Sequence, residues 1–176
     1  IAPLAGTEWR LPNGARVILK PTVFKADEIH LSAFSPGGSS LASDRDAFVL
    51  ESAGLAIDVG GVGAFDQVAL EKRLAGKAAS ATPFIDALEE GISGSASPKD
   101  VETMFELVYL YFTAPRRDSA AFEAFRQSAR AMLEHASADP GRAYSDTITR
   151  VMTNYHPRIR LVNSKMIDSL DLNRSM

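Results

Sequence analysis

Histidine is the side chain in this sequence best suited to bind a metal ion or to transfer protons, and three are present. His30 lies in a segment that alternates like a β-strand, His135 lies near the end of a helical segment, and His156 precedes a proline. No two of them stand three or four residues apart, the spacing that places two ligands on one face of a helix. The histidines by themselves therefore predict no metal site.

Three further patterns resemble catalytic or phosphate-binding motifs. Glu89 and Glu90 are adjacent carboxylates, but neighbours in a strand or turn point to opposite sides, which argues against an acid–base pair. The run from Gly91 to Ser95 lacks the spacing of a G-x-S-x-G nucleophile elbow. The glycines between Gly60 and Gly63 follow a predicted helix rather than a strand, which is typical of a helix end. With no cysteine either, the sequence contains no self-contained catalytic constellation.

The N-terminal half of the sequence predicts strands followed by helices. Two β-prone runs flank Pro12-Asn13-Gly14, a hairpin signal, and a further strand covers 28–35 with Ile29, Leu31, Ala33 and Ser35 on one face. Ser43, with Asp46 three residues later, predicts the start of a helix over Asp44 to Val59. A short helix over Asp66 to Leu74 follows, and Gly76 ends it.

The C-terminal half predicts a second hairpin and then three helices. Segments 78–85 and 90–97 alternate as strands, and the helices begin near Pro98, Asp118 and Asp139. The first of these helices, over Pro98 to Ala114, has an apolar face broad enough to pack on two sides. We therefore predict that its aromatic stripe belongs to the core. The stripe consists of Phe105, Tyr109 and Phe112.

The composition is that of one folded domain. The 176 residues, 45% of them hydrophobic, suffice for a sizeable core. A net charge of -3 and scattered basic residues argue against nucleic acid as a partner. No apolar run approaches the ~20 residues of a membrane span. Because the chain begins at Ile1 rather than Met, we expect it to be a piece of a longer protein.

Several stretches of sequence are distinctive. They are L-P-N-G-A-R-V-I-L-K-P-T, F-S-P-G-G-S-S-L, L-A-G-K, F-E-A-F-R and the long block from Glu89 to Arg116. Together with the order of predicted elements, they resemble a domain of the insulinase/pitrilysin family of zinc peptidases, most of all bacterial members with several homologous domains in one chain. The resemblance extends from Glu8 onward. It implies an α+β fold, a largely antiparallel sheet with helices packed mainly on one face, here truncated at the C-terminus.

The resemblance also indicates where the family's chemistry would lie. A catalytic domain carries H-x-x-E-H on the helix after the third strand, and a distal glutamate completes the zinc site. The equivalent window here is Phe48-Val49-Leu50-Glu51-Ser52, in which only the glutamate is present. Phe48 cannot bind zinc, Ser52 binds it poorly, and Glu51 without a metal has no polarised water to deprotonate. The resemblance therefore implies no catalytic residue, no cofactor and no metal in this segment, with zinc held by the catalytic domain of the parent protein.

The implied role is that of a non-catalytic domain of a zinc-dependent metalloendopeptidase. It would span 1–176 and be incomplete at its C-terminus, with a linker over 1–7 and a loosely ordered tail over 158–176. Such domains help to form the peptide-binding chamber, so the expected partners are the parent's catalytic domain and the peptide substrate. An unpaired strand edge would favour self-association of the isolated segment. The alternative is a structural or partner-binding subunit of the same fold without peptidase activity. The family favours a periplasmic or otherwise exported location.

Overall fold

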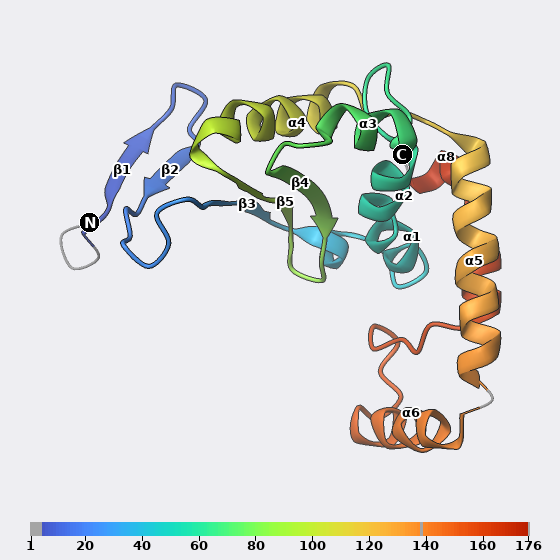
Figure 1. Cartoon of the computed structure of the whole chain (residues 1–176). Helices are drawn as coiled ribbons and strands as arrows, with labels where there is room; N and C mark the ends of the chain where they lie inside the picture. The colour runs from blue at the N-terminus through green and yellow to red at the C-terminus, as the bar shows by residue number, and fades with distance from the viewer. Residues whose placement is uncertain (1–4, 138, 176) are drawn as a thin grey trace.

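The chain begins with a β-hairpin that forms a sheet of its own. The structure, a computed structural model, describes residues 5–137 and 139–175. Strands β1 (Thr7–Arg10) and β2 (Arg16–Leu19) pair antiparallel. Gly14 between them has a φ of 88°, a conformation that favours glycine. The hairpin predicted around Pro12-Asn13-Gly14 is confirmed, and it lies at one end of the molecule (Figure 1).

The main sheet has three antiparallel strands in the order β3-β5-β4. They are β3 (Ile29–Pro36), β4 (Ala79–Ile85) and β5 (Glu89–Ala96). Side chains alternate between the two faces of a sheet, and one face here is buried through Ala81, Ile92 and Ala96. The opposite face is open and carries a row of exposed hydroxyl side chains. Ser32, Ser93 and Thr82 lie directly across from one another in this row.

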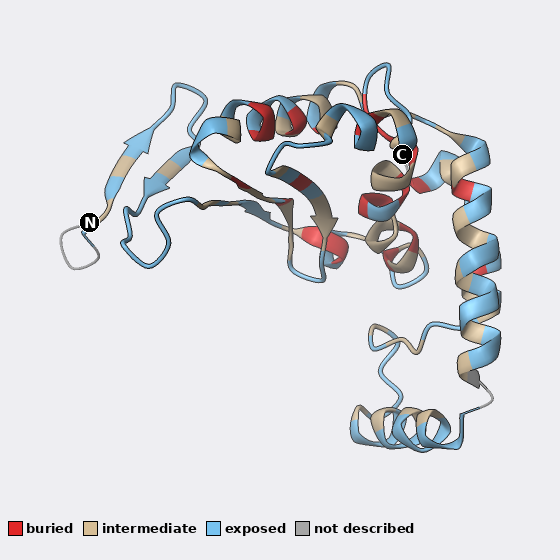
Figure 2. Ribbon diagram, viewed as in Figure 1, coloured by how far each residue is buried: buried red, intermediate tan, exposed pale blue. Residues whose placement is uncertain are grey.

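Helices cover the buried face of the main sheet. They are α1 (Ala47–Glu51), α2 (Ala53–Gly60), α3 (Gln67–Leu74) and α4 (Val101–Thr113), and short 3-10 turns precede α1 (Gly38–Leu41) and α4 (Pro98–Asp100). Helices α1, α2 and α4 contact β4, and α4 also contacts β5. Figure 2 shows the buried residues gathered between these helices and the sheet. The predicted α+β architecture, with an antiparallel sheet covered mainly on one face, is confirmed.

The remaining helices extend the molecule to one side. Helix α5 (Ser119–Ser137) runs past α1 and α2, and α6 (Pro140–Met152) turns beneath it (Figure 1). Two short helices, α7 (Ser164–Asp168) and α8 (Leu172–Ser175), return along α5 and α1. In the described part of the chain, no helix is long and apolar enough to cross a membrane.

The core has two parts. The first lies between the sheet, α3 and α4, and it includes Val62, Leu70, Ile92 and Leu107. The second lies between α2, α5 and the C-terminal segment. Its buried members are Ala56, Phe122, Ile167 and Leu170, with Phe48, Phe125, Ala129, Leu133 and Leu172 partly buried around them.

The opening helix predicted over Asp44 to Val59 is divided in two. Residues 44–46 form a turn, α1 ends at Glu51, and α2 begins at Ala53. At the break the Ser52 hydroxyl donates to the Val49 carbonyl over 2.6 Å, an alternative partner that competes with regular helix bonding. The predicted start is confirmed in part, because the Ser43 hydroxyl accepts from the Asp46 amide over 3.3 Å.

The aromatic stripe of α4 is exposed, so the prediction that it belongs to the core is wrong. Phe105, Tyr109 and Phe112 are 54%, 67% and 72% exposed. The buried side of α4 is a neighbouring one that includes Met104 and Leu107. A broad apolar face shows that a helix has more than one surface to cover, but it does not identify which surface faces the sheet.

The C-terminal segment packs on the body, so the prediction of a loosely ordered tail over 158–176 is wrong for its described part. Ile167 and Leu170 are 6% and 4% exposed, in the second core. The Arg126 guanidinium, on α5, donates to the carbonyls of Ile167 and Asp168 over 3.4 and 3.0 Å. At the other end, the linker expected over 1–7 includes Thr7, which is already in β1, whereas residues 1–4 lie outside the described ranges.

Candidate functional site

The loop after β3 sets the position of α1. Gly38 has a φ of 62°, and a Cβ added there would lie 2.2 Å from the Asp86 carbonyl oxygen, so only glycine fits this approach. The Gly38 amide donates to the Glu90 carboxylate, and the Ser39 amide donates to the Asp86 carbonyl over 2.8 Å. The P-G-G-S-S sequence is therefore fixed to the β4–β5 turn, and Ser39 is brought beneath α1.

Glu51, at the end of α1, is held by this loop and by the C-terminal segment. The hydroxyl of Ser39, a residue that is 1% exposed, donates to Glu51 Oε1 over 2.6 Å. On the other side, Arg160 Nη1 lies 4.0 Å from Glu51 Oε2. The carboxylate is thus engaged by one neutral donor and faces one cation.

Arginine side chains connect the C-terminal segment to the same loop. Arg158 donates to the carbonyls of Ser39 and Ala42 over 2.7 and 2.6 Å, and it also pairs with Asp44. Arg160 donates to the Asp44 carbonyl. These contacts join positions more than a hundred residues apart in sequence, and together they enclose Glu51.

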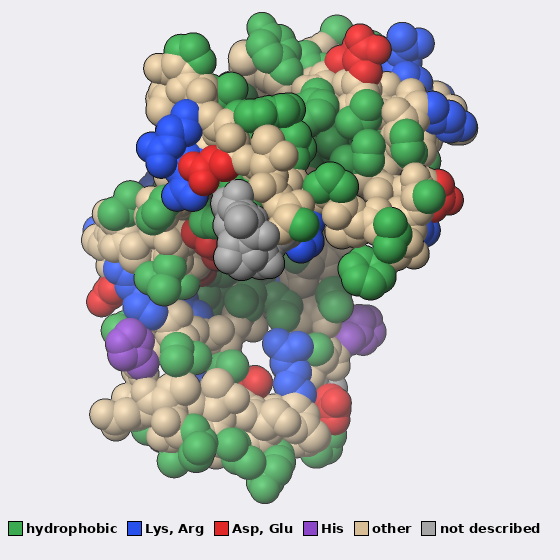
Figure 3. All heavy atoms as spheres, turned by 90° about the vertical axis from the view of Figure 1, so that its left-hand side faces the viewer, with side chains coloured by type: hydrophobic (Ala, Val, Ile, Leu, Met, Phe, Trp, Pro, Cys, Tyr) green, Lys and Arg blue, Asp and Glu red, His purple; other side chains and the backbone are tan. Residues whose placement is uncertain are grey.

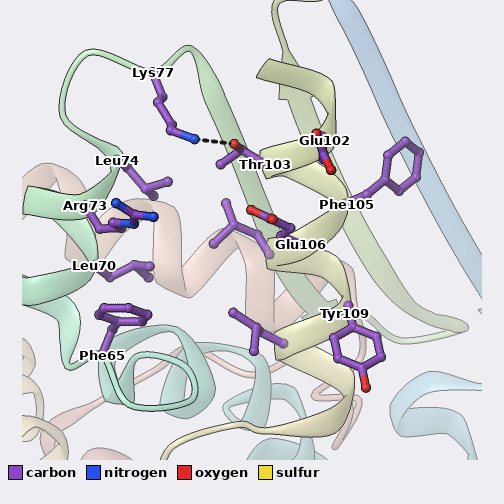
Figure 4. Close-up of a pocket in the computed structure, with 12 residues that line it drawn as sticks. Phe65, Leu70, Arg73, Leu74, Lys77, Glu102, Thr103, Phe105, Glu106 and Tyr109 are labelled. Atoms are coloured by element: carbon purple, nitrogen blue, oxygen red, sulfur yellow. Dashed lines mark hydrogen bonds between the residues drawn. The ribbon is translucent and has the colours of Figure 1, made fainter. Parts of the chain in front are cut away.

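A hollow of about 520 Å³ lies between α3 and α4. Its floor is apolar, and charged side chains stand along its two sides (Figure 4). Lys77 crosses one end and donates to the Thr103 hydroxyl over 2.6 Å. Figure 4 shows the Arg73 guanidinium extending into the hollow and the rings of Phe105 and Tyr109 directed away from α3. The hollow can receive apolar groups, but it brings together no pair of residues arranged for catalysis.

A tyrosine on α4 is hydrogen-bonded to an aspartate on α2. The Tyr111 hydroxyl donates to the Asp58 carboxylate over 3.1 Å. Burial, and then the nearby negative charge of Asp58, raise the pKa of Tyr111 well above its usual range. Tyr111 is therefore a neutral donor that joins α4 to α2.

Comparisons with known proteins agree with this architecture. No protein-family model matches the sequence. The probable zinc protease PqqL of Haemophilus influenzae is 26% identical over 123 residues, which cover 70% of this chain and 13% of that protein. This similarity agrees with the resemblance of the sequence to the insulinase/pitrilysin family of metallopeptidases. The chain spans only about an eighth of the length of that relative.

Solved structures of proteases and of a peptidase inactive domain share the fold. The periplasmic protease PqqL of Escherichia coli superposes with a TM-score of 0.74 at 19% identity, covering 97% of this chain and 19% of that one. A mutant of the ferredoxin protease FusC, in complex with Arabidopsis ferredoxin, gives 0.77 at 17% identity and covers 99% and 19%. The M16 peptidase inactive domain from Pseudomonas fluorescens gives 0.75 at 18% identity and covers 98% and 42%.

The residues at the family's zinc motif do not fit a zinc ion here. Phe48 packs against the second core and offers no donor atom. The Ser52 hydroxyl donates to a backbone carbonyl, and Glu51 accepts from Ser39. Within residues 5–137 and 139–175, no three histidine or acidic side chains gather where they could hold a metal. A zinc-dependent step therefore cannot be assigned to this window.

The other residues considered from the sequence are not brought together. His30 lies beside Glu28, with 3.4 Å between its Nε2 and the carboxylate, whereas His156 accepts from the Arg158 amide over 3.2 Å. Glu90 accepts from the Gly38 loop. Ser39 and Arg160, the residues that enclose Glu51, were not identified from the sequence, because neither belongs to a motif that predicts such a contact.

Proposed function

We propose that this chain is a non-catalytic domain of a zinc-dependent metalloendopeptidase. The observation that carries the proposal is the engagement of Glu51. In a zinc peptidase, the motif glutamate must be free to take a proton from metal-bound water. Here Ser39 donates to it and Arg160 faces it, and Phe48 and Ser52 stand where the two histidine ligands would be.

The surroundings of Glu51 support a structural role for that residue. The Arg160 guanidinium supplies positive charge near the carboxylate without a metal. One solved neighbour is an inactive domain of an M16 peptidase, which agrees with this view, and the relative from Haemophilus influenzae is a probable zinc protease, which agrees with a peptidase parent. We propose that zinc and the general base belong to another domain of the parent protein.

The open face of the main sheet is the surface we assign to the peptide chamber. It combines the hydroxyl row of Ser32, Ser93 and Thr82 with a second row, in which Phe34 and Phe84 lie on either side of Gly91. Hydroxyl groups can donate to or accept from the backbone of any peptide, and phenylalanine rings can contact its apolar side chains. Such a surface suits a chamber wall that holds peptides without strict sequence preference. The parent's catalytic domain would lie across the chamber.

Metal analysis tests the first part of the proposal. The purified chain is treated with a chelator, incubated with one equivalent of zinc, passed through a desalting column and analysed for metal. We expect far less than one zinc per chain, and the same value for Glu51→Gln. Nearly one zinc per chain, lost in Glu51→Gln but retained in the surface control Glu71→Gln, would refute it.

Peptide hydrolysis by the parent protein tests the second part. Glu51→Gln in that protein should change the rate by less than about tenfold, whereas loss of a true general base costs about 10²–10⁴-fold. A parent sequence without any intact H-x-x-E-H would instead favour the alternative, a structural or partner-binding subunit without peptidase activity.

A further inference from the structure

Helix α6 is amphipathic, but its apolar side faces solvent. Tyr144, Ile148, Val151 and Met152 recur at the spacing that places side chains on one face of a helix. They are 69%, 44%, 59% and 81% exposed. Figure 3 shows hydrophobic side chains along the lower rim of the molecule, where α6 lies. We call these four residues the α6 stripe.

The polar side of α6 is the one directed toward the rest of the chain. Arg142, Asp146 and Arg150 line a small hollow of about 210 Å³ shared with Leu133 of α5 and the 161–164 segment. Arg142 also donates to the Val162 carbonyl over 3.5 Å. The usual arrangement of a surface helix, apolar inside and polar outside, is thus inverted. Burying the α6 stripe would remove apolar surface from water, which is favourable.

We propose that the α6 stripe binds the α6 stripe of a second copy of this chain, with the two helices antiparallel. A two-fold arrangement about Ile148 places Ile148 opposite its equivalent and Tyr144 opposite Met152. The residues beside the stripe are uncharged, since Ser145, Thr147 and Thr149 occupy them. Two identical stripes can therefore approach without placing like charges against each other. A contact of this kind closes on itself and forms a dimer rather than a filament.

The charge pattern favours a second protein helix over a lipid surface. Helices that lie on membranes carry many lysine or arginine residues on the polar face that remains exposed to the headgroups. Helix α6 carries Arg142 and Arg150 together with Asp146, and that face is directed toward the chain's own α5 and 161–164 segment. An anionic membrane would thus gain little from the charges of α6.

The size of the stripe indicates a weak dimer. Four side chains on each of two helices bury on the order of 1,000 Å² in total, at the lower end of specific protein interfaces. We expect dissociation in the range of tens of micromolar. This inference is independent of the role proposed for Glu51, because α6 carries no residue of the zinc-motif window.

Cross-linking tests the geometry directly, because the chain contains no cysteine and each introduced thiol is the only one present. Ile148→Cys should form a disulfide-linked dimer under mild oxidation. Tyr144→Cys and Met152→Cys should form few dimers alone but many when mixed. The control is Met132→Cys on α5, which is 75% exposed and lies outside the stripe. If Ile148→Cys cross-links no faster than Met132→Cys, the antiparallel pairing is wrong.

Sedimentation velocity of the unmodified chain tests the association itself, from about 10 to 300 µM, the range expected for an interface of this size. The wild type and Met132→Glu should shift from monomer toward dimer, whereas Ile148→Glu should weaken the association more than about tenfold because it buries an unpaired charge. Circular dichroism confirms that the variants fold. A monomeric wild type across this range refutes the proposal, as does a dimer unaffected by Ile148→Glu. Vesicles of phosphatidylcholine and phosphatidylglycerol that bind the monomer through Ile148 would also refute it.

Discussion

Truncation of Leu170 tests whether the C-terminal segment belongs to the folded core. Leu170 is 4% exposed and lies in the second core with Ala56, Phe122 and Ile167, residues that come from three separate parts of the chain. Leu→Ala substitutions at buried sites lower the free energy of unfolding by about 2–5 kcal/mol. The loss is larger when the surrounding side chains cannot move into the cavity that the substitution leaves. Because α2 and α5 also support other parts of the structure, we expect Leu170→Ala to cost about 3–4 kcal/mol.

The assay is thermal unfolding followed by circular dichroism. For a domain of this size, 1 kcal/mol corresponds to about 2–4 °C, so the melting temperature should fall by about 6–16 °C. Leu88→Ala is the matched control, since it removes the same atoms from a residue that is 73% exposed in the β4–β5 turn. It should change the melting temperature by about 2 °C or less. Equal effects of the two substitutions would show that the C-terminal segment does not pack on α2 and α5.

Three further predictions test other parts of the structure, two by thermal unfolding and one by the pH dependence of stability. Phe105→Ala should lower the free energy of unfolding by less than about 1.5 kcal/mol, because the ring is 54% exposed. Met104→Ala, at a residue with 0% exposure, should lower it by about 2–5 kcal/mol. The opposite order would show that the other side of α4 faces the sheet. Gly38→Ala should lower the free energy of unfolding by more than about 3 kcal/mol, because the added Cβ would meet the Asp86 carbonyl. Gly14→Ala should lower it by only about 1 kcal/mol, because an added Cβ there has nothing within 4 Å. Similar losses for the two substitutions would contradict the loop geometry. Tyr111 has a folded-state pKa raised above its ordinary 10.0, so its stabilising effect should be complete below pH 10 and lost as the pH rises toward the folded-state pKa. Tyr111→Phe should flatten that alkaline decline, and an unchanged pH profile would show that Tyr111 is not buried in the neutral form.

Local features of this fold could be predicted from the sequence because their causes lie within a few residues. Asp66 and Asp118 were expected to begin helices, and each accepts a hydrogen bond from the amide three residues later, over 2.8 and 2.9 Å. Asp139 likewise accepts from the Gly141 amide over 2.9 Å. The alternation predicted for β3 is seen in its first half, where Ile29 and Leu31 are partly covered and His30 and Ser32 are exposed, because the period of a strand is fixed by its backbone. Ala33 and Ser35, predicted on the same face as Ile29, are exposed.

Features that depend on contacts between distant residues could not be predicted in this way. Arg158 and Ser39 are 119 positions apart, and nothing near either residue indicates that the arginine will donate to the serine carbonyl. The same limit applies to α4, whose apolar residues occupy more than one face. Only the positions of the sheet and α3 decide that Met104 is covered and Phe105 is not.

The candidate site combines both kinds of feature, and this explains how a motif glutamate can persist without its chemistry. The identities of Phe48 and Ser52 were sufficient to predict that the zinc ligands are absent. The Glu51 carboxylate is only 33% exposed, so partners that donate to it or carry positive charge are favourable, because a partly buried charge without partners is costly. Ser39 provides a donor from the loop after β3, and Arg160 provides a nearby positive charge from the C-terminal segment, whose Arg158 also donates to the Ser39 carbonyl. Glu51 would then be retained because it joins these segments, which is a reason for its presence that does not require a metal.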